Sequence, residues 1–165
     1  MRKCSMELTI REGCPGDEEA ILGLLYELAE YEKLTDRFGL TREIVARDFF
    51  GPTPACFSAL AFLGEEAVGV MTWYPTYASF AAARTIHLED LYLRPSRRGK
   101  GNGRKMLAWL AKHALKSGVG AITWFVLDWN TPSIGFYDSL GSKETSGWLS
   151  YSLSSEALED LADYA

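Results

Sequence analysis

The sequence predicts an α/β domain built around a central mixed β-sheet that is flanked by helices. Short β-prone runs alternate along the chain with segments that carry apolar residues at helical spacing. Their order is strand, two helices, a β-hairpin with a third strand, and then helix, strand, helix, strand. The 165 residues contain no internal repeat, low-complexity tract or linker. Residues 1–165 are therefore expected to form a single domain.

The N-terminal part is predicted to hold one strand and two helices. Residues 7–11 alternate enough between polar and apolar for a strand. A helix is expected from Asp17 to about Lys33, because apolar residues recur at helical spacing after Asp17. Thr41 can cap a shorter helix that runs through Phe50.

The middle of the chain is predicted to form a β-hairpin and a further strand. Residues 56–63 and 67–74 are apolar runs on either side of a turn at 64–66. Residues 75–83 have the small side chains typical of a loop. Residues 85–93 form the next β-prone run.

The C-terminal part is predicted to continue with helices and strands in alternation. A helix is expected from about Gly103 to Gly118. Residues 121–127 are continuously apolar, as in a strand that is buried on both faces. The last expected elements are a helix from Pro132 to Leu140, a strand at 148–153, and a helix at 155–164 with Leu158 and Leu161 facing inward.

Composition argues against several functional classes. The net charge of -5 disfavours general nucleic-acid binding. No apolar run reaches the roughly 18 residues of a membrane span, and the start lacks the apolar core of a secretion signal. Cys4, Cys14 and Cys56 are widely spaced, so we interpret them as free thiols in a reducing cytosol, not as a disulfide framework or a zinc site. We expect a cytoplasmic protein with no metal, no membrane partner and no nucleic-acid partner.

One stretch stands out for its chemistry: a basic, glycine-rich loop between the strand at 85–93 and the helix that follows. Gly99, Gly101 and Gly103 alternate along it, so backbone N–H groups can point into one concavity at a helix N-terminus. The basic residues around it are Arg94, Arg97, Arg98, Lys100, Arg104 and Lys105. The simplest physical interpretation is a phosphate-binding site.

The spacing of the glycines excludes two common phosphate loops, the P-loop and the dinucleotide fingerprint. The loop does match the pattern R-x-x-G-x-G at Arg98, Gly99, Lys100, Gly101, Asn102 and Gly103. A glycine-rich turn with a solvated basic face is the simpler alternative, but the strand–loop–helix context favours a binding site. Here the chain resembles the GNAT acetyltransferases, in which this motif holds the pyrophosphate of acetyl-CoA.

The resemblance extends along nearly the whole chain. The segments ELAEYEKL (27–34), HLEDLYLRP (87–95), RGKGNGR (98–104) and VLDWNTPSIGFYDSLG (126–141), followed by Gly147-Trp148, are similar to the diamine (spermidine/spermine) and thialysine acetyltransferase branch. This resemblance implies a single-domain GNAT fold, with the mixed sheet splayed at the acetyl-CoA site, and a homodimer. It also implies cofactor contacts from the backbone of Leu91, Tyr92 and Leu93, from the loop as far as Arg104, and from Asn130 and Ser133.

Tyr137 is the candidate catalytic acid. An ordinary phenol titrates near pH ~10, so it keeps its proton at neutral pH and can give it to a leaving thiolate. Tyr137 follows Ser133 by four residues, which puts both on one face of the expected helix. The alternative is a core tyrosine that packs beside Phe136. The similarity of NTPSIGFY to the catalytic tyrosine motif of the family favours the catalytic role.

Glu89 is the candidate base, acting through water, or else an exposed carboxylate that holds the charge of the amine. Both interpretations stay open at this stage. Strand alternation is expected to put Glu89 on the face opposite Leu88 and Asp90. Acceptor binding is expected from Tyr31, Glu32, Glu89, Asp90 and Trp148, because carboxylates and aromatic faces suit a cationic amine.

The chain departs from the polyamine enzymes of this branch at several acceptor positions. Ser79 and Ala81 stand where those enzymes carry an acidic residue and a tryptophan, and Thr145-Ser146 stands where they carry a glutamate, with Glu144 nearby. Fewer carboxylates are thus available for the far amines of a polyamine. The acceptor is expected to be a lysine-like amino acid such as thialysine, or a short diamine.

Three hypotheses for function follow. The first is acetyl-CoA-dependent N-acetylation of a primary amine on a small molecule. The second is acetylation of a protein or peptide lysine, which needs an open groove and is disfavoured by the acidic rim and the bulky Trp148. The third is a non-catalytic acyl-CoA sensor, which the presence of Glu89, Tyr137 and the loop argues against.

Overall fold

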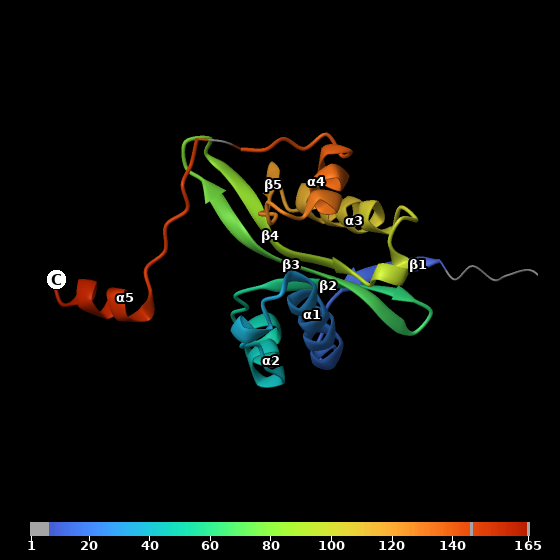
Figure 1. The fold of residues 1–165 in the computed structure, drawn as a ribbon, viewed down its shortest axis with the longest axis horizontal. Coiled ribbons are helices and arrows are strands. Elements are labelled where there is room, and N and C mark those ends of the chain that lie inside the picture. Colours follow the sequence, from blue (N-terminus) through green and yellow to red (C-terminus); the bar gives the residue numbers. More distant parts are fainter. Residues whose placement is uncertain (1–6, 146, 165) are drawn as a thin grey trace, which may run out of the picture. The chain divides into compact units, whose positions relative to one another are not determined.

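A computed structural model describes residues 7–145 and 147–164 and contains one five-stranded sheet (Figure 1). The strands lie in the order β1-β2-β3-β4-β5. Pairing is antiparallel from β1 to β4 and parallel between β4 and β5, which confirms the predicted mixed sheet. The strands are β1 (Leu8–Glu12), β2 (Phe57–Leu63), β3 (Glu66–Ala78), β4 (Ala83–Leu93) and β5 (Ala121–Thr123).

The described chain contains five α-helices and two short 3-10 helices. It divides after Phe125 into two compact units, so the single domain expected for residues 1–165 stays a prediction. The first unit holds the sheet, α1 (Glu18–Glu32), η1 (Thr35–Arg37), α2 (Arg42–Phe50), η2 (Pro95–Arg97) and α3 (Asn102–Lys116). The second holds α4 (Thr131–Asp138) and α5 (Ser155–Ala162).

Two hydrophobic cores lie on opposite faces of the sheet in the first unit. One face packs against α3, through side chains such as Trp73 and Leu88 of the sheet and Met106 of the helix. The other packs against α1 and α2, through side chains such as Val70 and Tyr92. Figure 1 shows α3 on one side of the strands and α1 with α2 on the other. This layering leaves β4 in the middle of the unit, in contact with both cores.

The helix ends follow the predicted signals closely. Thr41 caps α2, because its hydroxyl accepts a hydrogen bond from the backbone N–H of Ile44 at 3.3 Å. Helix α1 ends where Lys33 adopts a left-handed conformation, with its N–H bonded to carbonyls of the last turn. The predicted helices from Asp17 and from Thr41 are thus confirmed.

The predicted loop at 75–83 is wrong over its first half, because β3 continues through Pro75 to Ala78 and only a short turn precedes β4. Pro75 cannot donate a ladder hydrogen bond, which argued against a strand. However, β2 pairs with β3 only as far as Phe57 opposite Trp73. Pro75 therefore lies beyond the end of β2, where β3 has a strand neighbour on one side only and proline is tolerated.

Three later predictions are also wrong. Strand β5 covers Ala121–Thr123 only, and the Phe125 side chain after it is 82% exposed, so 121–127 is not a strand buried on both faces. Residues 147–153 contain no strand. Helix α5 does form, but Leu158 and Leu161 are more than half exposed and do not face inward within the described chain.

Cys14 and Cys56 are free thiols, as predicted, whereas Cys4 lies outside the described residues. Among the described residues, no helix is long and apolar enough to span a bilayer.

Candidate active site

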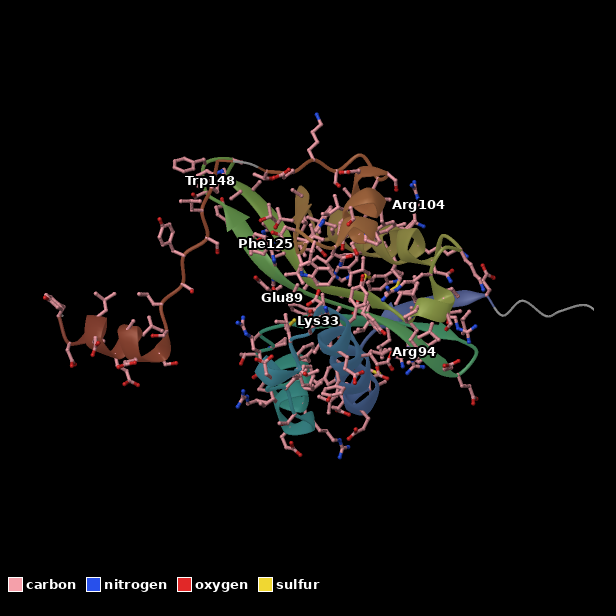
Figure 2. The ribbon with its side chains drawn as sticks, in the orientation of Figure 1. Lys33, Glu89, Arg94, Arg104, Phe125 and Trp148 are labelled. Atoms are coloured by element: carbon pink, nitrogen blue, oxygen red, sulfur yellow. The ribbon has the colours of Figure 1, made fainter. Side chains whose placement is uncertain are left out.

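The candidate site is centred on a β-bulge in β4. Asp90 pairs with Thr72 of β3, and Leu88 pairs with the next residue, Trp73, so Glu89 has no partner on β3. An extra residue in one strand locally shifts the alternation of side chains. Glu89 consequently has no place in the β3–β4 ladder, and 54% of its side chain is exposed. Figure 2 labels its side chain.

The bulge corrects the face predicted for Asp90. Simple alternation put Leu88 and Asp90 on the same face, whereas Leu88 packs in the core beside α3 and Asp90 bonds to Thr72 on the face of α1 and α2. His87 pairs with Tyr74, two residues from Thr72 along β3. His87 and Asp90 therefore share one face and lie on either side of Glu89.

Asp90 is a partly buried carboxylate in an acidic environment. Thr72 donates its hydroxyl to Asp90 Oδ2. Burial raises the pKa of Asp90 above its ordinary value, the Thr72 hydrogen bond lowers it in part, and the charge of Glu89 raises it further. Burial likewise raises the pKa of Glu32, with a contribution from the nearby Asp90 charge. The sequence-predicted acceptor residues Glu32, Glu89 and Asp90 thus lie together.

The C-terminus of α1 contributes to the same negative potential. Glu32 is the last residue of this helix, and the last turn holds no basic residue. A helix C-terminus carries a partial negative charge that favours cations. An ammonium group that enters here would relieve the repulsion between the carboxylates.

Sequence reasoning missed three side chains of this site: Thr72, Tyr74 and Cys56. Burial raises the pKa of the Cys56 thiol to about 11, and the Asp90 charge adds to this, so the thiol stays protonated at neutral pH. Burial also raises the pKa of Tyr74, with the Glu89 charge as the next cause. Thr72 and Tyr74 come from β3 and Cys56 directly precedes β2, and only the register of the hairpin reveals that they lie beside Asp90.

Beyond the bulge, one edge of β4 is open. Pairing with β5 ends at His87 opposite Thr123, so Leu91, Tyr92 and Leu93 have no partner in β5. Strand-edge N–H and C=O groups that lack a neighbouring strand are available to an extended ligand. The expected splay of the sheet is therefore present at the residues predicted to bind the cofactor through their backbone.

The glycine-rich loop connects the end of β4 to α3, and two glycines give it its shape. Gly99 and Gly101 have φ values of 73° and 75°, which favour glycine. Gly101 is the N-cap of α3 and has no side chain to bond the first-turn N–H groups. The amide of Asn102, inside the first turn, donates to the carbonyl oxygen of Arg97 at 3.0 Å and fixes the loop. The loop therefore has the geometry of an anion site.

The basic residues of the loop separate into two groups. Arg94 and Arg97 form ion pairs with carboxylates, Arg94 with Glu27 and Glu66 and Arg97 with Glu66. These two arginines thus stabilise the fold more than they provide charge for a ligand. The side chains of Lys100 and Arg104 are exposed at the loop and at the start of α3.

Arg98 is held by two tyrosines. Its guanidinium lies over the rings of Tyr31 and Tyr92, at 4.8 and 5.5 Å, and its Nε donates to the carbonyl oxygen of Leu93 at 2.7 Å. Tyr31, predicted on the acceptor side, thus contacts the first residue of the glycine motif. The sequence gives no signal for this contact, since 67 positions separate the two residues.

The remaining predicted residues belong to the second unit. The Asn130 side chain caps α4 by accepting a hydrogen bond from the Ser133 N–H at 3.4 Å. Tyr137 lies in the last turn of α4, with its ring 5.3 Å from Phe136 and its carbonyl oxygen bonded by the Ser142 hydroxyl. Trp148 lies in an irregular segment and is 82% exposed.

Comparison with known proteins identifies the family. The pattern of the Acetyltransferase (GNAT) family matches residues 21–141. The chain belongs to this GNAT family. It is 37% identical to the thialysine N-epsilon-acetyltransferase of Bos taurus over 93% of this chain and 96% of the relative. It is 32% identical to spermidine/spermine N(1)-acetyltransferase-like protein 1 of Homo sapiens over 98% of this chain and 25% of that protein.

Solved structures agree on the fold. An integron cassette protein of V. cholerae superposes with a TM-score of 0.79 at 20% identity, covering 95% of this chain and 98% of the other. In the chain itself, the N-terminus of α3 has no side-chain cap and offers N–H groups to an anion, and the part of β4 beyond β5 offers backbone groups to an extended ligand. The matches to named acetyltransferases support the predicted enzymatic class and branch.

Proposed function

We propose that the protein transfers the acetyl group of acetyl-CoA to a primary amine of a small, amino-acid-like or diamine substrate. The observation that carries this proposal is the cluster of Glu32, Glu89 and Asp90 around the bulge of β4, next to the C-terminus of α1. A buried carboxylate with a raised pKa needs a cationic partner to ionise fully. A protonated amine is such a partner.

Acetyl-CoA binding is assigned to the loop and to the open strand edge. The N–H groups at the start of α3 and the side chains of Arg98, Lys100 and Arg104 would hold the pyrophosphate. The backbone of Leu91, Tyr92 and Leu93 would pair with the pantetheine arm. Asn130 and Ser133 are proposed as further contacts, because they resemble cofactor-contacting positions of the branch.

Tyr137 is proposed to protonate the leaving thiolate, and Glu89 to bind the amine or help remove its proton. A phenol and a thiol of CoA type have comparable proton affinities, so transfer between them is near balance. Tyr31 and Trp148 are proposed as acceptor contacts, with Tyr31 also bracing Arg98.

The turn between β3 and β4 supports a short acceptor, and the names of the relatives support an amine acceptor. The positions Ser79 and Ala81 lie in the tight turn between β3 and β4 and carry no charge, whereas Ser146 is outside the described residues. The relatives reported above are named for thialysine and for spermidine/spermine, both primary amines with further polar groups. Because Ser79 and Ala81 supply no carboxylate for the far amines of a polyamine, an amino-acid-like amine fits the site better than a long polyamine.

The test is an amine panel with acetyl-CoA in which the released thiol is measured. Thialysine, lysine, ornithine, short diamines, spermidine and spermine should be compared at equal concentration. We expect the highest kcat/KM for an amino-acid-like amine or a short diamine. If no amine of the panel is acetylated, the proposal fails.

We also propose a homodimer that resides in the cytoplasm. Large apolar side chains of the second unit are exposed, among them Trp148, Leu149 and Tyr151, and a second copy would cover such a surface. The free thiols of Cys14 and Cys56 suit a reducing compartment. Light scattering after size-exclusion chromatography would reveal the dimer, and a monomer at micromolar concentration would reject it.

A further inference from the structure

His87 and Glu89 are two acceptors that lie close together at the bulge of β4. The Nε2 atom of His87 lies 3.7 Å from Oε2 of Glu89, and 10% and 54% of their side chains are exposed. This distance is too long for a hydrogen bond between them. One nitrogen atom can, however, lie at about 2.9 Å from both. The pair thus has the spacing of a two-point acceptor for a single ammonium group.

The other ring nitrogen of His87 is already bonded. Nδ1 lies 3.1 Å from Oγ1 of Thr123, and that hydroxyl lies 3.5 Å from the carbonyl oxygen of Ile86. If Thr123 donates to Ile86, it accepts from the Nδ1–H of His87. Neutral His87 then carries its proton on Nδ1 and leaves the lone pair of Nε2 facing Glu89.

Acetyl transfer requires a base at this position. A lysine-like ammonium titrates near pH ~10.4, so only about one amine in 2,500 is neutral at pH 7. An ordinary carboxylate has a pKa about six units below that of the amine, whereas an ordinary imidazole is about four units below. Imidazole is the better proton acceptor, and an adjacent carboxylate stabilises the imidazolium that forms.

Building on the proposed function, we propose that His87 is the base that deprotonates the acceptor amine and that Glu89 holds the ammonium. The ammonium gives one proton to Nε2 of His87. The neutral nitrogen then forms a C–N bond to the thioester carbonyl carbon, the C–S bond breaks, and the thiolate takes up a proton. The second N–H proton leaves as the amide forms, and His87 passes its proton to solvent. Thr123 is a positioning residue that holds the required tautomer.

The effect of protonating His87 can be told apart from the effect of protonating its neighbours. The rings of Tyr74 and Phe125 lie 5.3 and 4.9 Å away, and β5 contributes the uncharged Thr123. Of the titratable groups, Tyr74 has a raised pKa and stays neutral near pH 7, and Glu89 is the adjacent carboxylate. Asp90 and Glu32 share the site and have raised pKa values, so an Asp90→Asn variant serves as their control.

The first experiment is the pH profile of kcat/KM for the best amine of the panel, from about pH 5.5 to 9.5. Wild type should lose activity on the acid side as its base becomes protonated. His87→Gln should lower kcat about 10²-fold. It should also lose the plateau above the acid limb, so that its residual rate keeps rising tenfold per pH unit as free amine accumulates. Glu89→Gln should raise KM and keep the limb. Added imidazole should restore part of the rate of His87→Ala.

The proposal is overturned if His87→Gln keeps the kcat and the pH profile of wild type. It is also overturned if Glu89→Gln changes the acid limb and His87→Gln does not. A second measurement does not depend on turnover: the long-range ¹H–¹⁵N NMR spectrum of the imidazole rings. We expect a neutral His87 protonated on Nδ1 and a shift toward the Nε2–H form in Thr123→Val. A wild-type Nε2–H tautomer would reject His87 as the base, whereas failure of the amine panel would reject the proposed function.

Discussion

Arg94 and Glu27 form an ion pair that ties the end of β4 to α1. Nη2 of Arg94 lies 2.8 Å from Oε1 of Glu27, and its Nε lies 3.1 Å from both carboxylate oxygens. Glu27 also accepts the hydroxyl of Tyr92 at 3.1 Å. The hydrogen bond from Arg94 is the main cause of the lowered pKa of Glu27. The start of the glycine-rich loop is thus anchored by an ion pair and a hydrogen bond that need no ligand.

Arg94 and Arg98 should therefore respond differently to truncation. Arg94→Ala should lower the free energy of unfolding by about 1 kcal/mol, a value reduced for solvent screening because both partners are about a third exposed. Arg98→Ala should raise KM for acetyl-CoA about tenfold or more with a smaller loss of stability. Chemical denaturation and acetyl-CoA titration measure the two effects. Equal effects of both variants on KM would contradict this division.

The left-handed backbone at Gly101 gives a second prediction. Gly101→Ala should destabilise the protein by about 1–2 kcal/mol and weaken acetyl-CoA binding, since an added Cβ disfavours a φ of 75° even though the site has open space. Gly23→Ala is a matched control, because Gly23 is exposed in the middle of α1 with open space for a Cβ. It should stabilise the protein by about 0.5–1 kcal/mol. If both substitutions shift the thermal unfolding temperature in the same direction, this prediction is wrong.

Asp90→Asn is expected to weaken amine binding and to change the pH dependence of stability. The pKa of Asp90 is raised above its ordinary value of 3.8 in the folded state, so the folded protein binds the proton more tightly than the unfolded chain. Relative to the variant, wild type should lose stability as pH rises from about 4 through the raised pKa. The difference in unfolding free energy between the two proteins, measured against pH without substrate, tests this. A difference that grows in favour of wild type with pH would have the wrong sign.

The same substitution should raise KM for the amine about tenfold or more with little effect on KM for acetyl-CoA, because a partly buried carboxylate is removed from the acceptor side only. Thr72→Val is a milder control that removes the hydrogen bond to Asp90 and keeps the carboxyl group.

Tyr137→Phe should lower kcat about 10²-fold while acetyl-CoA still binds, because the variant loses only a hydroxyl group. The bond from the Ser142 hydroxyl reaches the carbonyl oxygen of Tyr137, so α4 should keep its end. Steady-state kinetics and calorimetric titration with CoA measure the two quantities. Full activity of the variant would remove Tyr137 as the acid.

The sequence was sufficient to predict features that depend on local signals. The cap at Thr41, the helical spacing in α1 and the R-x-x-G-x-G loop are all encoded within a few neighbouring residues, and the structure contains the predicted elements there. The acidic residues Glu32, Glu89 and Asp90 could be proposed for the acceptor side because they belong to short segments that resemble the family.

Features that depend on strand register could not be predicted. The bulge at Glu89 depends on how β3 pairs with β4, and alternation along β4 alone put Asp90 on the wrong face. The continuation of β3 through Pro75 depends on where β2 ends, which no residue of β3 indicates. The partners Thr72 and Thr123 come from other strands and were missed for the same reason.

The bulge also places adjacent residues of β4 in different surroundings. Leu88 is held by the core beside α3, whereas Glu89 and Asp90 lie outside that core, near His87 and Thr72. Substitutions at 89 and 90 can thus alter which amine is accepted without repacking the interior. Deleting Glu89 would remove the bulge and leave Asp90 opposite Thr72, so the site would lose the carboxylate that the extra residue exposes. A directed-evolution library for new acceptors should therefore randomise these two positions and keep the length of the strand fixed.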